Sequence, residues 1–531
     1  MNLFKSYFLI LFFIVGILST PLAAGAESQQ LLLQKAAEHL EGWRVPEAAQ
    51  VIAKLDTTGP ESLAVLDLQA QLAFYEGNYA EAFTIAEKGL AIESASEERQ
   101  TMRLLAQRTR DAIGKLKRFE SEHFVLFLDE QQDGILVPWL LDGLEKTYKA
   151  IGKELGYYPS EKVRVEIAPD VSTFNAISTL SLRDIEETGA VGICKFNKVM
   201  AISPRTLTHG YRWLDSLSHE YLHYVIVALS DNKAPIWLHE GIARFYETRW
   251  RQKDGSDPMP DYLTPSSQTL LARALKSNDL VPFEKMEPSL IYLETPQQVQ
   301  LAYAEAASTI DYITQQKGAE GIQNLLAGLR NEATPEAVQT VMAVPFDQFE
   351  TQWKDFLKAK GLKEVEGSRV RKLKVRGEGK ENEESVELKE IQSVVARNRT
   401  HLADRLWARG RTVAASAEYR RALKASPHSP IILNRLGRVL TDAKKYRQAL
   451  PYLKRAQKLD PDYVGTYVQM GRLYHAIKEY PPAKVVLAEA IQINPYDPTI
   501  HRLLFEIHTS LGETQEAEKS KANLQKLLRQ G

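Results

Sequence analysis

The residues best suited to chemistry are His219 and His223, which flank Glu220 in the sequence His219-Glu220-Tyr221-Leu222-His223. Side chains four positions apart lie on the same face of a helix, so both imidazoles can bind one divalent ion. Glu220 would lie beside that ion, where a carboxylate can take a proton from an attacking water. Apolar neighbours on both sides indicate that this helix is largely buried. The spacing therefore predicts a hydrolytic metal site on a helix.

A hydrolytic zinc site uses three protein ligands and leaves the fourth position to water. The metzincin pattern would place glycine at 226 and histidine at 229, but the chain has Ile226 and Leu229 there, which excludes that subclass. A second helix, introduced by a proline, is predicted over 235–247. Glu240 within it is the expected third ligand.

Other residues of the second helix leave alternatives open. Glu240 could instead pair with Arg244 one turn further on, and Glu247, on the same face, could be the ligand. Adjacent helical positions diverge by about 100°, so His239 and Glu240 cannot both face the ion. We expect His239 to point elsewhere.

Trp237-Leu238-His239-Glu240-Gly241-Ile242-Ala243 follows the first motif closely, and together the two motifs resemble those of the gluzincin, or thermolysin-like, zinc peptidases. The resemblance covers 119–362. It implies one zinc ion held by His219, His223 and Glu240, with Glu220 as general base and a peptide as substrate. It also implies that Gly241 packs the second helix closely behind the first, and that a strand at 198–203 forms the sheet edge that binds extended substrate.

Two further positions bear on this resemblance, one as an additional candidate site residue and one as a departure from the family pattern. Tyr303 is the candidate second donor to the developing oxyanion, although a tyrosine at helical spacing is also a common core residue. Arg244 stands where such enzymes commonly carry an acidic residue that orients a ligand histidine, so Glu247 or Asp215 would take that part. Two histidines and a carboxylate also suit other ions, including iron, but the helical motif favours zinc.

A repeat of 34 residues dominates the carboxyl-terminal part of the chain. Ala415, Ala449, Ala483 and Ala517 recur at this period, which is that of tetratricopeptide repeats, and we predict such a domain over 396–531. A weaker echo of the same period predicts helical hairpins over 27–118. Tetratricopeptide repeats commonly bind proteins. Arg438 and Arg472 hint at an acidic or carboxyl-terminal peptide partner, and a solvated basic face is the alternative.

Between the helical regions the pattern changes to β-strands, predicted at 123–128, 163–167 and 199–202. The stretch 363–395 is charged and poor in aromatic residues, which predicts a flexible linker. The expected fold class is therefore α+β. A thermolysin-like metallopeptidase core at 119–362, with a small sheet and active-site helices, is flanked by all-α helical-hairpin repeat domains.

The amino terminus has a pattern of its own. Lys5 precedes an apolar run over 7–18, and Ala24-Gly25-Ala26 resembles a cleavage site, which predicts a signal peptide at 1–26 and an exported protein, periplasmic or secreted. An uncleaved membrane anchor is the alternative. Cys194 is the one cysteine, so no disulfide forms within the chain, and we interpret it as a small buried hydrophobe.

The whole-chain composition sets broader limits. With 531 residues the chain predicts two or more domains, and its net charge of -1 provides no bulk attraction to nucleic acid or to anionic lipid. The sequence favours an exported zinc metallopeptidase whose repeats select partners or substrates. The competing hypothesis is a scaffold of the cell envelope, built on the repeats, with an inactive or latent peptidase-like domain.

Overall fold

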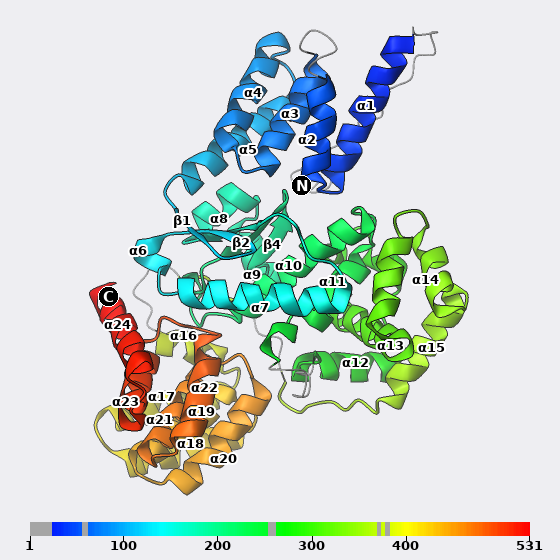
Figure 1. Cartoon of the computed structure of the whole chain (residues 1–531). Coiled ribbons are helices and arrows are strands. Elements are labelled where there is room, and N and C mark those ends of the chain that lie inside the picture. Colours follow the sequence, from blue (N-terminus) through cyan, green and yellow to red (C-terminus); the bar gives the residue numbers. More distant parts are fainter. Residues whose placement is uncertain (1–23, 56–61, 253–261, 369–372, 377–382, 531) are drawn as a thin grey trace.

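The computed structural model describes residues 24–55, 62–252, 262–368, 373–376 and 383–530. The chain is mostly helical, with a small mixed sheet at the centre and helical hairpins toward both ends (Figure 1). The predicted signal peptide lies outside the described residues except for 24–26. Within the described ranges, no helix is long and apolar enough to span a bilayer.

The amino-terminal helical block, residues 24–113, confirms the predicted hairpins. Ser62 and Ser96 each cap the following helix by accepting a backbone N–H, an arrangement that contributes about 1 kcal/mol per cap. Two of its turns use left-handed backbone, with φ of 53° at Trp43 and 83° at Gly77. The helices are α1 (Ala24–Glu41), α2 (Val45–Leu55), α3 (Leu63–Tyr75), α4 (Tyr79–Ile92) and α5 (Glu97–Ile113).

The central sheet contains the three predicted strands and two more. Its order is β1-β2-β3-β5-β4, with β2, β3 and β5 parallel and each outer strand antiparallel to its neighbour. The prediction that 198–203 forms the sheet edge is wrong, because β4 folds back in a hairpin and pairs with β5. The strands are β1 (Lys117–Glu120), β2 (Phe124–Leu128), β3 (Val163–Ala168), β4 (Gly192–Lys195) and β5 (Lys198–Ile202).

The tight turn between β4 and β5 is formed by Phe196 and Asn197, both at φ 58°. A two-residue hairpin favours positive φ at both central positions, but a bulky aromatic residue is uncommon there. Phe196 packs edge-on against Phe74 of α3, with ring centroids 5.2 Å apart. The turn therefore joins the sheet to the amino-terminal helical block.

A buried polar network makes a second connection between the amino-terminal helical block and the sheet. The Tyr79 hydroxyl donates to Glu166 Oε1 at 2.6 Å, and Lys198 Nζ lies 2.7 Å from Glu166 Oε2 and 2.9 Å from the Tyr79 oxygen. All three side chains are buried. Removing either charged partner would leave an uncompensated buried charge, which is strongly destabilising.

The central region shares one hydrophobic core with α3 to α5. Short 3-10 turns lie at 204–206, 249–251, 283–286 and 290–292. The helices are α6 (Glu130–Asp133), α7 (Val137–Leu155), α8 (Val171–Ser178), α9 (Leu182–Thr188), α10 (Trp213–Ser230), α11 (Ile236–Tyr246), α12 (Pro265–Ser277), α13 (Pro296–Gly328), α14 (Thr334–Met342) and α15 (Phe346–Ala359). Of these, α7, α8 and α10 pack on the sheet.

The carboxyl-terminal helical array, residues 394–530, consists of four successive hairpins. A side-chain carbon added at Gly437 or Gly471 would collide with Leu453 or Leu487 of the partner helix, so the small residues of the repeat allow close helix packing. The array and the helix preceding it are α16 (Glu383–Glu390), α17 (Val394–Ala408), α18 (Thr412–Ala425), α19 (Pro430–Asp442), α20 (Tyr446–Leu459), α21 (Val464–Ala476), α22 (Tyr480–Ile491), α23 (Pro498–Leu511) and α24 (Thr514–Gln530).

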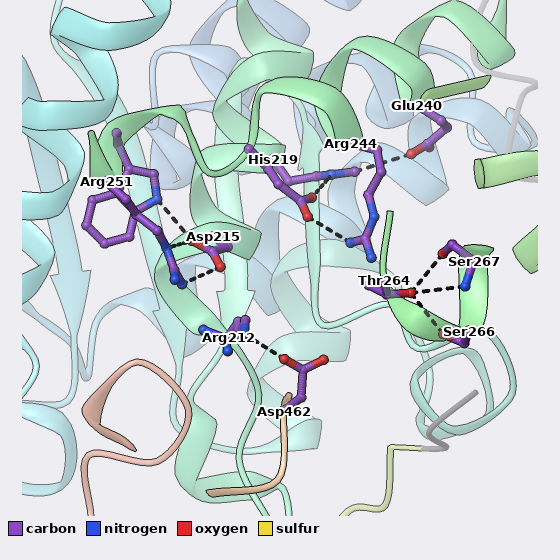
Figure 2. A network of polar contacts seen from close by, with 12 residues as sticks. Arg212, Asp215, His219, Glu240, Arg244, Arg251, Thr264, Ser266, Ser267 and Asp462 are labelled. Carbon is purple, nitrogen blue, oxygen red and sulfur yellow. Dashed lines mark hydrogen bonds and ion pairs between the residues drawn. The ribbon is translucent and has the colours of Figure 1, made fainter. Parts of the chain in front are cut away.

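The carboxyl-terminal helical array is docked on the central region at the start of α10. Arg212, which precedes α10, contacts Asp462 Oδ1 at 2.5 Å and Glu489 Oε2 at 2.9 Å, and the Trp213 indole donates to the Ile491 carbonyl at 2.9 Å. Figure 2 shows the pair of Arg212 and Asp462. The array therefore holds the amino-terminal end of the helix that carries His219.

The described parts of 363–395 make ordered contacts where the sequence predicts a flexible tether. Val375 forms a β-bridge with Leu207, and Glu387 of α16 accepts from Arg435 at 2.6 Å and from the Tyr463 hydroxyl at 2.5 Å. Glu387 belongs to a charged stretch that resembles a solvated linker, but its carboxylate is paired with a cation and a hydroxyl donor of the docked array. Local composition does not reveal such partners.

Asp133 is a buried carboxyl group at this docking interface. Its Oδ1 accepts from Ser203 at 2.8 Å and from Tyr496 of the array at 2.5 Å. Burial raises its pKa from 3.8 to about 6 despite these hydrogen bonds. The folded chain therefore binds a proton at Asp133 more tightly than the unfolded chain does. As the pH rises from the unfolded to the folded pKa of Asp133, the free energy of unfolding should fall by about 3 kcal/mol.

We predict that Asp133→Asn removes this dependence on pH. Because the amide does not ionise, the melting temperature of the variant should rise relative to wild type between pH 4 and pH 7. Calorimetry of both full-length proteins at the two pH values tests this. An equal difference in melting temperature at both values would show that Asp133 does not titrate in this range.

Candidate active site

Helices α10 and α11 bring together the three predicted metal ligands. His219 Nε2 lies 3.2 Å and His223 Nε2 lies 3.8 Å from Glu240 Oε2. One ligand atom from each residue lies within 4.8 Å of the other two. Figure 2 shows His219 and Glu240 facing each other across the two helices. Residues 21 positions apart in sequence thus converge on one point.

Close packing of α11 against α13 places Glu240 in this position. A side-chain carbon at Gly241 would lie 2.6 Å from the Ala306 carbonyl oxygen of α13, so only glycine allows this approach. The resemblance led us to expect Gly241 to pack against α10, but it faces α13, which leaves the neighbouring Glu240 directed at α10. Arg244 pairs with Glu247 at 2.8 Å, so the expected alternative of an ion pair between Glu240 and Arg244 is not formed.

The orientation of His219 depends on a second carboxylate. Its Nδ1 lies 2.9 Å from Glu247 Oε2, so a hydrogen on Nδ1 leaves Nε2 free toward Glu240. Burial alone would lower the pKa of His219, but its hydrogen bonds to Glu240 and Glu247 raise the pKa to about 10, so this position favours positive charge. Of the two acidic residues considered for this role, Glu247 contacts the ring and Asp215 pairs with Arg251 at 2.7 Å instead.

His223 has a different partner on its far side. Its Nδ1 lies 3.4 Å from Nδ1 of His239, while its Nε2 faces Glu240. Burial lowers the pKa of His223 to about 3 and that of His239 to about 4, so both rings are neutral near pH 7. His239 is thus directed away from Glu240, as the helical spacing predicts. Its contact with His223 is a feature that sequence spacing did not reveal.

Glu220 is buried against the edge strand of the sheet. A side-chain carbon at Gly192 of β4 would lie 2.7 Å from Glu220 Cγ, and the Cys194 backbone N–H donates to the carboxylate. Burial raises the pKa of Glu220 to about 7, a value suited to a group that both accepts and returns protons near neutral pH.

Burial also raises the pKa of the Cys194 thiol well above its usual range, which disfavours the nucleophilic thiolate.

These groups line one cavity of about 770 Å³, within the usual size range of ligand sites. Tyr303 of α13 lies in its lining and is half-buried rather than sealed in the core. Burial and the nearby Glu240 and Glu220 carboxylates raise the pKa of its phenol well above 10, so the hydroxyl keeps its proton and can donate it in a hydrogen bond.

The donor set fits a zinc ion. Two imidazoles and one carboxylate converge, and His223 is neutral. The carboxylates of Glu240 and Glu247 beside His219 favour positive charge there, which a bound zinc ion would supply in place of the proton on the ligating nitrogen. Three protein ligands would leave a coordination position open toward the cavity, as in hydrolytic rather than structural zinc sites.

Known protein families match two parts of this architecture. A model of the Peptidase MA superfamily matches residues 172–359, and a tetratricopeptide repeat model matches residues 431–463. The chain thus contains a Peptidase MA superfamily domain and at least one tetratricopeptide repeat. The first match includes α10, α11 and α13, which carry the predicted site residues. No curated protein matches the chain.

Several solved structures resemble the chain weakly. Yeast LTA4 hydrolase is 12% identical, with 77% of this chain and 66% of that chain covered and a TM-score of 0.32. The Cut9–Hcn1 hetero-tetramer of APC/C is 14% identical, covering 96% of each chain at a TM-score of 0.25, and a MamA RS-1 double mutant is 21% identical, covering 28% and 85% at 0.24. TM-scores this low do not establish a shared fold.

Proposed function

We propose that this protein is a zinc-dependent metallopeptidase of the gluzincin type that hydrolyses peptide bonds. The observation that carries the proposal is the convergence of His219, His223 and Glu240 within 4.8 Å, with Glu220 buried beside them in a large cavity. The Peptidase MA superfamily match over the same residues supports it. Residue types, geometry and domain match therefore point to one reaction class.

Each group of residues in the site would have its own role in peptide hydrolysis. A zinc ion held by His219, His223 and Glu240 would polarise the scissile carbonyl and make water more acidic. Glu220 would take a proton from the attacking water and pass it to the leaving amine. Tyr303 would donate its hydroxyl hydrogen to the oxygen on which negative charge develops.

The substrate would bind in extended form along β4. Residues 192–195 line the cavity, and β4 pairs with β5 on one side only, so its other edge is the outer edge of the sheet. A strand edge without a neighbouring strand can form backbone hydrogen bonds with an extended peptide regardless of its sequence, here at positions other than the Cys194 N–H, which already donates to the Glu220 carboxylate. This strand takes the role that we first expected for 198–203.

The metal content of the purified full-length protein tests the proposal. We expect one zinc per chain by mass spectrometry, loss of casein or peptide cleavage after chelation, and recovery of cleavage when zinc is restored. Because the ligands include two histidines, zinc affinity should also fall as the pH is lowered and protons compete for the imidazoles. A protein without stoichiometric metal would contradict the proposal and favour the scaffold hypothesis.

We also propose that the protein is exported, on the pattern of residues 1–26. Cleavage after Ala26 would remove only three residues of α1. Among the side chains of α1 whose burial is described, residues 29–41, the first buried one is Ala36, so we expect the first hairpin to keep its packing. Amino-terminal sequencing of the mature protein should begin at Glu27. An intact leader in the membrane fraction would instead indicate an anchor.

The carboxyl-terminal helical array would bind a protein partner, as tetratricopeptide repeats generally do. Its two candidate arginines already have partners within the array. Arg438 stacks on Trp407 at 3.8 Å, and Arg472 contacts Asp442 at 3.0 Å. An acidic ligand would have to compete with these contacts, so we do not extend the proposal to an acidic partner.

A further inference from the structure

The amino-terminal helical block forms part of the wall of the metal-site cavity. Trp43 from the α1–α2 turn, Tyr75 from α3, and Met102 and Leu105 from α5 line the same cavity as His219, His223 and Glu240. These four side chains come from outside the matched peptidase region, which begins at residue 172. We refer to them as the apolar wall.

The apolar wall is fixed to both sides of the site. Trp43 packs on Tyr224, the residue after His223, with ring centroids 6.0 Å apart, and the adjacent Arg44 forms an ion pair with Asp231 just beyond the end of α10. On the sheet side, Tyr75 lies with its ring centroid 6.5 Å from that of Phe196, in the turn that follows β4. The wall therefore has a defined position relative to α10 and β4.

The chemistry of the apolar wall differs from that of the metal side. Among the described residues lining the cavity, the amino-terminal helical block contributes no charged side chain, and the Gln71 amide donates to the Tyr75 hydroxyl at 3.1 Å. Glu220, Glu240 and Glu247 line the cavity on the metal side. A ligand that spans the cavity thus meets a charged region and an apolar one.

Three of the four wall residues remain partly exposed within the cavity, namely Trp43, Tyr75 and Met102. Covering such apolar surface removes it from water and so favours binding. A charged side chain placed against these three residues would lose hydration, because none of them carries an opposite charge. Methionine is flexible and polarisable, so the wall can adapt to apolar side chains of different shapes.

We propose that the apolar wall is a substrate pocket that selects peptides with a bulky apolar side chain, such as phenylalanine, leucine or methionine, within the bound segment. This inference rests on the proposed function, because it assigns the specificity of the same site. The backbone of the peptide lies along β4, while one of its side chains reaches across the cavity to Trp43, Tyr75 and Met102. The amino-terminal helical block is thus part of the substrate site and not a separate binding module.

Binding of labelled hexapeptides to full-length, zinc-loaded Glu220→Gln protein tests the proposal by fluorescence anisotropy. The peptides differ at their two central positions, which carry phenylalanine, leucine, alanine or aspartate. An apolar pocket usually distinguishes such side chains by about 1–3 kcal/mol, so phenylalanine or leucine should bind about 10–200-fold more tightly than alanine. Aspartate should bind more weakly still.

Met102→Asp and Leu104→Asp form the matched pair of variants. Both positions lie on α5, but Leu104 is 41% exposed and lies outside the cavity lining. Met102→Asp should lose most of the preference for phenylalanine over alanine, whereas Leu104→Asp should keep it. Equal melting temperatures of the two variants would exclude misfolding as the cause. An unchanged preference in Met102→Asp would overturn the proposal.

Photo-crosslinking supplies a readout that does not depend on affinity. A peptide with benzoylphenylalanine at the apolar position should label the segments that contain Trp43, Tyr75 or Met102, as mapped by mass spectrometry. Labelling confined to other segments, or no saturable binding of any peptide, would overturn the pocket.

Neither experiment requires catalysis, so the two ideas can fail separately. Zinc-dependent cleavage without preference for apolar peptides would leave the proposed function standing and remove the pocket. If the wild-type protein instead binds apolar peptides preferentially through the apolar wall but shows no zinc-dependent cleavage, the pocket stands and the proposed function fails.

Discussion

Glu220→Gln is expected to reduce the rate of peptide cleavage by about 10²–10⁴-fold, the usual contribution of a general acid–base group. Glutamine has nearly the same shape, so it should keep the packing against Gly192 and the contact with the Cys194 backbone N–H. It cannot accept a proton from water. The loss should therefore appear in kcat, with little change in zinc content.

The measurement compares steady-state cleavage and bound zinc for wild type, Glu220→Gln and Ser216→Ala. Ser216 lies on the same helix and lines the same cavity, so its variant controls for general disturbance of α10. It should retain nearly full activity. Equal cleavage by Glu220→Gln and wild type would rule out Glu220 as the general base.

Glu240→Ala is expected to abolish stoichiometric zinc binding, whereas Glu247→Ala should weaken zinc affinity by about 10–100-fold, as is typical when a group that orients a ligand is lost. The geometry gives the reason. Glu240 Oε2 faces Nε2 of both His219 and His223, while Glu247 Oε2 contacts Nδ1, on the other side of the His219 ring. Glu240 is placed as a ligand and Glu247 as the group that orients one.

Competition with a chromophoric zinc chelator measures both affinities, and melting curves with zinc added show whether each variant still gains stability from the ion. Arg244→Ala provides a control, because Arg244 contacts Glu247 and neither histidine. It should have a smaller effect than Glu247→Ala. If Glu247→Ala loses more zinc than Glu240→Ala, then Glu247 is the third ligand, which is the alternative that the helical spacing allowed, and Glu240 is not.

Much of the local structure could be predicted because it depends on neighbours in sequence. Continuous apolar runs predicted β2 and β5, alternation of apolar residues predicted β3, and the 34-residue period predicted the hairpins of the carboxyl-terminal helical array. Four-residue spacing placed His219 and His223 on one face of α10. Each of these patterns reflects the residue periodicity of a helix or a strand and can therefore be recognised in a short stretch of sequence.

The errors concern contacts between distant parts of the chain. The family resemblance implies that 198–203 is the sheet edge, whereas β4 pairs with β5 and forms that edge instead. The charged stretch around Glu387 was taken for a tether, although Arg435 and Tyr463 lie opposite it. In both cases the local pattern is compatible with two structures, and the partner that selects one of them is distant in sequence.

The donor types and helical spacing of the candidate metal ligands, the order of the two motifs and the period of the repeats can all be obtained from the residues alone. The folded structure is needed to show that Glu247 contacts His219, that His239 lies beside His223, and that Trp43, Tyr75 and Met102 share a cavity with them. The physical reason is that helical periodicity relates only residues within a few turns. The position of α11 against α13, and of the amino-terminal helical block against β4 and α10, depends on long-range packing at residues such as Gly241, Phe196 and Tyr79.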